Sequence, residues 1–247
     1  MSKQRDELKI LLIQVREDEE TALEEKNEFV RFAKLNDGQL TTLNVLKSPY
    51  FEPEIADKYD VVFIGGSSDA DVIDLKKYPW IADSKRLVLH CLEKEIPVLA
   101  SCYGFQLLIE AKGGKIERIG EYAEMNGSGE IMLTDDGKSD LIFSDMPEVF
   151  RAVAVHKESA TKLPEGVTLL ARSAKCPFHA VKVNGKPFYA TQFHSEIDKN
   201  DFIARIRRYQ ARYMDSDTLL ERLVDEALDM DDANSIPWKF IDRIVMK

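Results

Sequence analysis

Short apolar runs alternate with amphipathic stretches over residues 1–115, and this alternation constrains the fold more than any other feature of the chain. The apolar runs are short enough to be buried strands, whereas the stretches between them space their apolar side chains as helices do. Strands that alternate with helices form a parallel sheet covered on both faces, because each parallel connection has to cross over the sheet. The expected strands lie at 8–15, 43–46, 61–64 and 97–100, and the expected helices at 17–35, 84–94 and 104–111.

The pattern changes after residue 115 into short strands joined by turns. Asp135-Asp136-Gly137 and Asn184-Gly185 are turn signals, and the second is typical of a tight antiparallel hairpin. The expected strands lie at 115–119, 129–134, 151–155, 167–172, 180–183 and 187–193, and helical spacing resumes at 198. The sequence predicts an α/β fold with an open, mostly parallel sheet flanked by helices, antiparallel additions and a C-terminal helical appendage. We expect one domain over residues 1–197 and a helical extension over 198–247 packed on it.

Charge and hydropathy argue against several classes of partner. The net charge of −10 argues against nucleic acid and anionic membranes, because both repel an acidic surface. No stretch approaches the ~20 apolar residues of a membrane span, and the N-terminal residues lack the pattern of a secretion signal. We therefore expect a cytoplasmic protein that binds neither nucleic acid nor a membrane.

The cysteines are Cys91, Cys102 and Cys176. This set is odd and sparse, and no pair has the CxxC or Cys/His spacing of a zinc site. The sequence predicts free thiols in a reducing compartment, with no metal and no cofactor. Because a free cysteine usually packs as a small apolar side chain, a catalytic role for any of them needs further evidence.

Cys102 stands between a buried strand and an amphipathic helix, in the segment PVLASCYGFQLLIEAKGG. A nucleophile at such a sharp turn is presented at the carboxyl edge of the sheet, where open α/β sheets bind ligands. The N-terminal dipole of the following helix lowers the pKa of a thiol placed there, and the thiolate is the reactive form. Taken alone, the segment is equally compatible with a buried cysteine at a strand end.

Two further segments supply groups that a thiol nucleophile needs. In FIGGSSDADV a strand ends at Gly65-Gly66, where the backbone can approach a ligand closely, and one of these N–H groups paired with that of Tyr103 would form an oxyanion hole. In FYATQFHSE, His194 and Glu196 share one face if the strand continues that far, so the carboxylate would orient the imidazole. Each segment alone has an ordinary alternative: a strand-to-helix turn for the first and a surface pair for the second.

Together these motifs resemble those of the class I, triad-type glutamine amidotransferase family. The elbow of that family reads roughly GxCxGxQ, and residues 100–106 read ASCYGFQ. The closing motif of the family is similar to QFHPE, and residues 192–196 read QFHSE. The segments GGKIERIG, GEIMLTDDG and VAVHKE follow in the order of the family, so the resemblance covers about residues 8–197. It implies a flavodoxin-like sheet.

The resemblance also implies a reaction, the cleavage of the side-chain amide of glutamine. Cys102, assisted by His194 and Glu196, would attack the amide carbon, expel ammonia and form a γ-glutamyl thioester that water hydrolyses. The resemblance implies contacts to the substrate from Gln106 and His156.

The implied partners and the departures from the family pattern leave alternatives open. The chain has no SGGxDS loop and no other P-loop, so a synthetase partner chain would use the ammonia, and a homo-oligomer is the other assembly expected. Alternatively, the same triad hydrolyses γ-glutamyl conjugates or peptides, or the fold serves as a non-catalytic regulatory module. Ser67, Ala100 and Ser195 replace a proline, a glycine and a proline of the family, which indicates a divergent branch most similar to stand-alone GMP-synthase-like amidotransferases.

Overall fold

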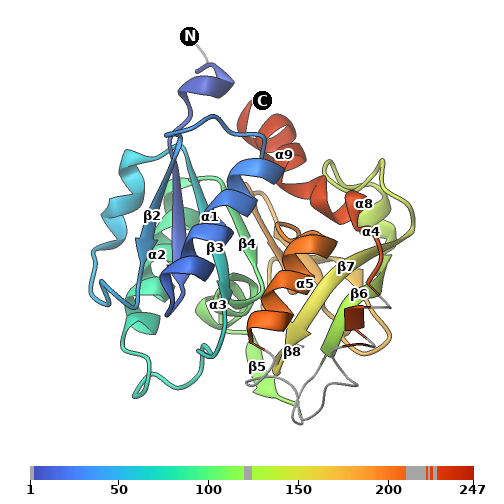
Figure 1. Cartoon of the computed structure of the whole chain (residues 1–247). Coiled ribbons are helices and arrows are strands. Elements are labelled where there is room, and N and C mark those ends of the chain that lie inside the picture. Colours follow the sequence, from blue (N-terminus) through green and yellow to red (C-terminus); the bar gives the residue numbers. More distant parts are fainter. Residues whose placement is uncertain (1–2, 120–123, 210–220, 222, 225–226) are drawn as a thin grey trace.

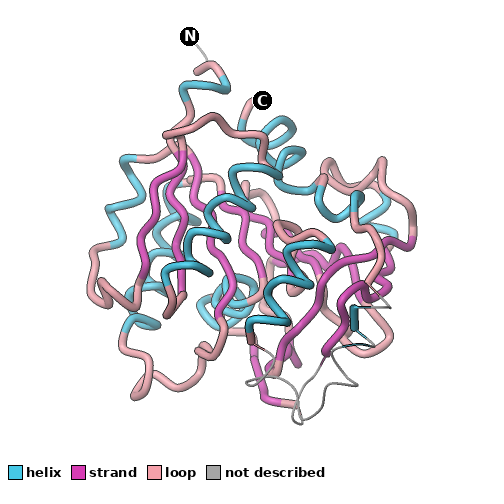
Figure 2. The backbone as a smooth tube through the Cα atoms, viewed as in Figure 1, coloured by secondary structure: helices cyan, strands magenta, loops and turns pink. Residues whose placement is uncertain are grey.

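The computed structural model describes residues 3–119, 124–209, 221, 223–224 and 227–247. In this part of the chain a nine-stranded sheet has the order β2-β1-β3-β4-β11-β10-β9-β6-β7 (Figure 1). Figure 2 shows the strands in magenta enclosed by helices in cyan. This is the predicted α/β fold, with a parallel half and an antiparallel half.

The parallel half contains the strands that the first part of the sequence predicted. They are β2 (Leu40–Asn44), β1 (Ile10–Val15), β3 (Val61–Ser67), β4 (Val98–Ser101) and β11 (Phe188–Thr191). The antiparallel half consists of β10 (Ala180–Val183), β9 (Val167–Arg172), β6 (Glu124–Leu133) and β7 (Val149–His156). Strand β11 joins the halves, because it pairs parallel with β4 and, through the Asn184-Gly185 hairpin, antiparallel with β10. A separate small sheet pairs β5 (Lys115–Arg118) with β8 (Glu158–Lys162).

The parallel strands are apolar on both faces because each face meets a different core. On β1, Ile10 and Leu12 pack in one core with Phe29, whereas Leu11 and Ile13 pack in the other. Side chains of a strand alternate between faces, so a run that is apolar throughout is what a doubly covered strand needs. The helices of this part are α1 (Glu19–Phe32), α2 (Trp80–Lys94) and α3 (Tyr103–Ala111), with 3-10 turns at Arg5–Glu7 and Pro53–Lys58.

The C-terminal residues extend the core on the face of the sheet that α1 covers. The elements are α5 (Lys199–Arg208), α8 (Asp231–Asn234), α9 (Ile236–Phe240) and a π-helical turn at Ile241–Val245. The fully buried ring of Phe240 lies 6.5 Å from the ring of Phe63 and 6.1 Å from that of Tyr189. These contacts support packing of this segment on the main domain, and the division at residue 197 stays a proposal.

Where the elements differ from the prediction, the reasons are local. Strand β3 continues to Ser67, so Gly65 and Gly66 lie inside the strand and not after it. The expected turn at 135–137 is a short helix, α4 (Asp135–Lys138), because the Thr134 hydroxyl caps it by accepting the Gly137 N–H. Strand β8 was not predicted, since ESATK has no apolar run. The apolar pair at 219–220 lies outside the described residues.

The burial of Phe240 predicts that the C-terminal segment contributes to the stability of the whole domain. Phe240→Ala should lower the free energy of unfolding by about 3–5 kcal/mol, because it leaves a cavity between the sheet and α9. Leu141→Ala, which truncates an apolar side chain that is 49% exposed, is the matched control and should change it by less than about 0.5 kcal/mol. Urea unfolding followed by circular dichroism measures both, and equal small effects would contradict the packing.

Candidate active site

Cys102 occupies a strained turn between β4 and α3. Its backbone has φ 49° and ψ −99°, a conformation that a residue with a side chain rarely adopts. The Cys102 N–H donates to the carbonyl oxygen of Thr191 at 2.7 Å, which ties the turn to the end of β11. Strain of this kind persists where the surrounding structure holds it, and it is frequent at reactive groups. The predicted nucleophile elbow is therefore present as a geometry.

Gly104 allows this turn to lie against the sheet. A Cβ at this position would lie 2.8 Å from the Ile64 carbonyl oxygen and 2.9 Å from the Ala100 Cβ. Both distances are shorter than non-bonded atoms tolerate, so α3 can approach β3 and β4 this closely only with glycine at residue 104. The absence of a side chain at Gly104 also leaves the room that Ala100 fills where the family usually has glycine.

His194 and Glu196 are adjacent in space, although not through the continuous strand that the sequence suggested. Strand β11 ends at Thr191, and His194 is held instead by an isolated bridge in which its N–H donates to the Val153 carbonyl oxygen at 2.8 Å. The His194 Nδ1 lies 2.6 Å from the Glu196 Oε1. The same carboxylate oxygen accepts the Ser101 hydroxyl at 3.1 Å, which links it to the end of β4.

Charges in this site favour a thiolate beside an imidazolium. Burial would raise the pKa of the Cys102 thiol, but the interaction with His194, with a smaller contribution from His156, holds that pKa below its ordinary value. Burial would lower the pKa of His194, but Glu196 and Cys102 raise it to about 10. Burial would raise the pKa of Glu196, and His194 holds it below its ordinary value. Each charge is thus stabilised by a neighbour of opposite sign.

The glycine pair meets Cys102 differently from the oxyanion arrangement expected of Gly65 and Gly66. The Gly66 N–H donates to the Oε1 of Glu25 at 3.1 Å, on the side of the buried Arg16–Glu25 ion pair. A Cβ at Gly66 would lie 2.7 Å from the His194 ring, so the backbone does pass close to the triad residues. In this conformation the Gly66 N–H is directed to Glu25 and not to Cys102, and this part of the prediction is corrected.

Gln106 and His156, the two expected substrate contacts, both line the pocket beside Cys102. The Gln106 Nε2 already donates to the Glu158 carbonyl oxygen at 3.0 Å and to the Gln192 Oε1 at 3.2 Å. The His156 Nδ1 lies 2.9 Å from the same Glu158 carbonyl oxygen. Both side chains therefore hold the chain around residue 158 in place, in addition to facing the pocket.

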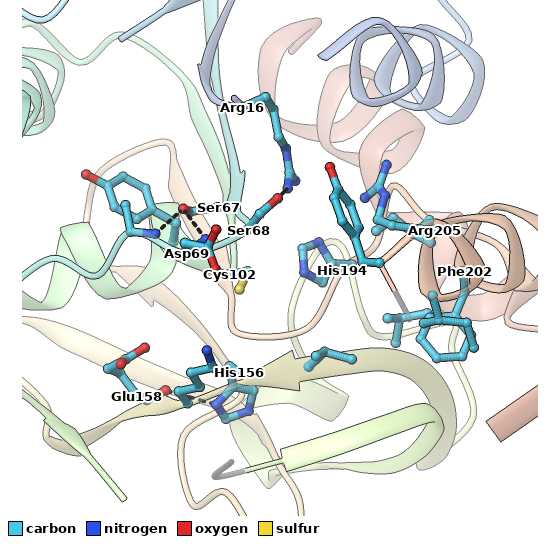
Figure 3. Close-up of a pocket in the computed structure, with 18 of the residues that line it drawn as sticks. Arg16, Ser67, Ser68, Asp69, Cys102, His156, Glu158, His194, Phe202 and Arg205 are labelled. Carbon is cyan, nitrogen blue, oxygen red and sulfur yellow. Dashed lines mark hydrogen bonds between the residues drawn. The ribbon is translucent and has the colours of Figure 1, made fainter. Parts of the chain in front are cut away.

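The pocket itself has a volume of about 110 Å³ and opens beside the Cys102 sulfur. Figure 3 shows His194 beside Cys102, with His156 and Glu158 across the pocket and Phe202 on the far side of His194. Arg16 directly follows β1, so its place at a strand end is a signal that the sequence did offer. The residues that α5 contributes, Phe202 and Arg205, carried no such signal, because the approach of this helix is set by tertiary packing. Other lining residues that sequence reasoning missed are Ser68, Asp69, Lys157 and Tyr209.

The described residues also contain a group able to hold a metal ion, which the cysteine spacing did not suggest. One ligand atom each of His156, Cys176 and His179 lies within 4.8 Å of the others, and all three residues are buried. Nothing in the sequence relates His156 to the other two, since the pairing of distant strands brings them together. In the part of the chain described here, no helix is both long and apolar enough to cross a membrane.

Comparison with known families gives a match to the model of glutamine amidotransferase class-I over residues 36–208, which is well over half of the chain. A glutamine-hydrolyzing GMP synthase subunit of Methanocaldococcus jannaschii is 33% identical over 139 residues, covering 56% of this chain and 71% of the relative. The corresponding GMP synthase subunit of Thermococcus kodakarensis is 34% identical over 148 residues, covering 60% and 71%. By contrast, the chain spans 22% of the GMP synthase of Ligilactobacillus salivarius, at 33% identity.

Solved structures share the fold over nearly the whole chain. A glutamine amidotransferase of Thermotoga maritima superimposes with a TM-score of 0.73 at 22% identity, covering 96% of this chain and 98% of that one. A glutamine amido transferase of Methylobacillus flagellatus superimposes with a TM-score of 0.72 at 15% identity, covering 96% and 95%. At these identities the likeness concerns the fold alone, and it extends through the C-terminal residues that the family model leaves out.

The lowered pKa of Cys102 predicts that this thiol reacts with iodoacetamide at a pH where ordinary cysteines do not. Its alkylation rate should change little between about pH 9 and pH 7, and should fall only below the lowered pKa, because the thiolate is the reacting form. In His194→Asn the imidazolium is lost, so the midpoint should rise toward ~8.5 or above. Alkylation followed by peptide mass spectrometry measures this, and an unchanged midpoint in His194→Asn would contradict the ion pair.

Proposed function

The chain belongs to the class I glutamine amidotransferase family, and from this premise we propose that Cys102 cleaves the side-chain amide of glutamine with His194 and Glu196 as its acid–base pair. The observation that carries the proposal is the convergence of three buried groups at one pocket. The strained Cys102 turn, the His194 ring and the Glu196 carboxylate come from segments about ninety residues apart, and nothing in the packing of the two cores requires a thiol, an imidazole and a carboxylate there.

The first half of the reaction forms a thioester and releases ammonia. The Cys102 thiolate attacks the amide carbon, and the carbonyl oxygen becomes an oxyanion. Because the His194 Nδ1 is bound to Glu196, the opposite nitrogen, Nε2, is the one that serves the sulfur and the leaving group. It gives its proton to the amide nitrogen, the carbon–nitrogen bond breaks, and ammonia leaves a γ-glutamyl thioester on the sulfur.

The second half returns the enzyme to its starting state. Neutral His194 takes a proton from a water molecule, and the resulting hydroxide attacks the thioester carbon. The carbon–sulfur bond breaks, glutamate leaves and Cys102 is again a thiolate beside an imidazolium. Glu196 stays ionised throughout and holds the His194 ring in one tautomer, which its contacts with both His194 and the Ser101 hydroxyl support.

We assign the oxyanion to the Tyr103 N–H together with a backbone N–H of residues 65–68. Tyr103 is the first residue of α3, so its N–H has no acceptor within the helix, and the helix dipole favours negative charge there. The Gly66 N–H becomes a donor to substrate only if it leaves the Glu25 carboxylate, which requires its peptide to turn. Glycine makes such a turn accessible at low conformational cost.

The lining of the pocket also favours a second substrate class, the γ-glutamyl conjugates and peptides. One wall is apolar and contains Val153, Val155, Ile197, Phe202 and Ile206. Ammonia as leaving group makes no use of such a wall, whereas a conjugate with an apolar substituent on the γ-glutamyl group would bury surface against it. The bond broken and the residues that break it are the same in both cases.

The similarity to single-function GMP synthase chains supports a partner that uses the ammonia. These relatives are named as glutamine-hydrolyzing subunits, which places glutamine hydrolysis on one chain of a larger enzyme. For the present chain we propose the same division of labour, with a synthetase chain docked so that ammonia passes between the sites. The homo-oligomer stays a prediction, as does the cytoplasmic location.

A substitution at Cys102 tests the proposed function directly. Cys102→Ala should abolish ammonia release from glutamine, with a loss of at least ~10⁴-fold, because no other described group at the pocket can form the acyl intermediate. Cys91→Ala, which removes a buried thiol in α2 far from the pocket, is the matched control and should keep the activity. Ammonia release is measured with glutamine and with γ-glutamyl peptides carrying an apolar residue.

The outcomes separate the candidate functions. Cys102-dependent release of ammonia from glutamine supports the amidotransferase, and Cys102-dependent cleavage of the γ-glutamyl peptides alone supports the conjugate hydrolase. Activity that survives Cys102→Ala would contradict both. Absence of turnover and of thiol labelling by a glutamine-like electrophile would support the regulatory module.

A further inference from the structure

A second cluster of reactive side chains lies next to the pocket and is not used by the proposed reaction. His156 ends β7, Cys176 lies in the loop between β9 and β10, and His179 directly precedes β10. Their exposed fractions are 5%, 0% and 0%, so the cluster is inside the protein. One ligand atom from each side chain lies within 4.8 Å of the other two.

We propose that His156, Cys176 and His179 together bind one transition-metal ion of the zinc type. A thiolate and two imidazoles are the ligands that zinc and cobalt(II) prefer, whereas magnesium and calcium require oxygen ligands. The hydroxyl of Ser159 adjoins the cluster, 3.3 Å from the His156 Nδ1 and 3.9 Å from the Cys176 Sγ. Three protein ligands and a small polar neighbour leave the fourth position of a tetrahedral site to water or to this hydroxyl.

The spacing of the side chains is close to what coordination requires. Zinc–nitrogen bonds of ~2.0 Å and zinc–sulfur bonds of ~2.3 Å place tetrahedral ligand atoms about 3.5 Å apart. The cluster, with ligand atoms within 4.8 Å, therefore has to contract by roughly 1 Å. Side-chain rotations supply a movement of this size, and the Cys176 loop can follow because it is not part of a strand.

Oxygen atoms around the cluster hold its members in orientation. The His156 Nδ1 contacts the Glu158 carbonyl oxygen at 2.9 Å, and the His179 Nε2 contacts the Ser173 hydroxyl at 3.1 Å. The same hydroxyl oxygen accepts the Cys176 N–H at 3.0 Å, which ties the thiol to the imidazole. Carbonyl and hydroxyl oxygens of this kind fix the ring orientation of metal-binding histidines in known sites.

The cluster has a route to solvent through the pocket, because His156 belongs to both. It lines the pocket beside Cys102 and also forms one corner of the cluster. The Cys176 thiol now donates to the Phe178 carbonyl oxygen at 3.5 Å, and on coordination its proton leaves with solvent while the thiolate binds the metal. The bound ion would keep its position whether or not Cys102 is catalytic, so this site does not rest on the proposed function.

Cobalt(II) absorption tests the site without a substitution at any proposed ligand. In the untagged Cys91→Ala/Cys102→Ala variant, Cys176 is the remaining thiol of the 247-residue chain. We expect this variant to bind one cobalt(II) per chain in equilibrium dialysis and to show a thiolate-to-cobalt charge-transfer band, which can then come from Cys176 alone. Adding zinc should displace the cobalt and remove the band.

Substitution of the second ligand defines the site further. His179→Gln on the same background should weaken cobalt binding by more than about tenfold, while His90→Gln, at a histidine on α2 paired with Asp57, should leave it unchanged. Absence of the charge-transfer band in the double variant would overturn the proposal. Binding that appears only with Cys102 present would also overturn it, because the metal would then sit on the Cys102–His194 pair.

Discussion

The parallel pairing of β11 with β4 is the constraint on which the site depends. Its register places Thr191 opposite Ser101, and the Cys102 N–H then donates to the Thr191 carbonyl oxygen at 2.7 Å. Because of this pairing, two motifs about ninety residues apart end at the same edge of the sheet. A slip by one residue would exchange the faces of β11 and carry His194 away from the sulfur. The alignment of two short strands thus matters more to the chemistry than any single contact of the triad.

Around this edge the protein buries several charges and pairs them in order. Glu196 is fully buried between His194 and Ser101, and Arg16 and Glu25 form a buried ion pair at the Gly66 backbone. Burial raises the pKa of Glu28 to about 7, against the lowering influence of its partner Arg205. Removing one member of such a pair leaves an uncompensated charge, which is strongly destabilising. The charges therefore fix the relative positions of α1, α5 and the triad residues.

Much of the fold could be predicted from the sequence because it depends on local patterns. Runs that are apolar throughout indicate strands buried on both faces, and strands such as β9 and β10 lie where their residues indicated. Strand β8 could not be predicted, since its residues are polar and its pairing with β5 depends on tertiary contacts. The short helix α4 formed from residues that equally suit a turn, and the Thr134 cap decided between the two.

For the site, the sequence indicated the residue types and the structure supplied their relations. Cys102, His194 and Glu196 could be found because each follows a strand of the parallel sheet. Their mutual geometry could not, since His194 is held by a bridge to Val153 and not by a continuing strand. The engagement of Gly66 by Glu25 depends on a helix far away in sequence, as does the grouping of His156 with Cys176 and His179 on distant strands.

The most direct test of the account is covalent labelling of the nucleophile by a glutamine analogue that carries an electrophilic ketone in place of the amide. Intact-protein and peptide mass spectrometry would locate the label, with unmodified glutamine as competitor. The account predicts one label per chain, on the Cys102 peptide, formed more slowly when glutamine is present. A label on Cys91 or Cys176, or labelling of Cys102 that glutamine does not slow, would contradict it.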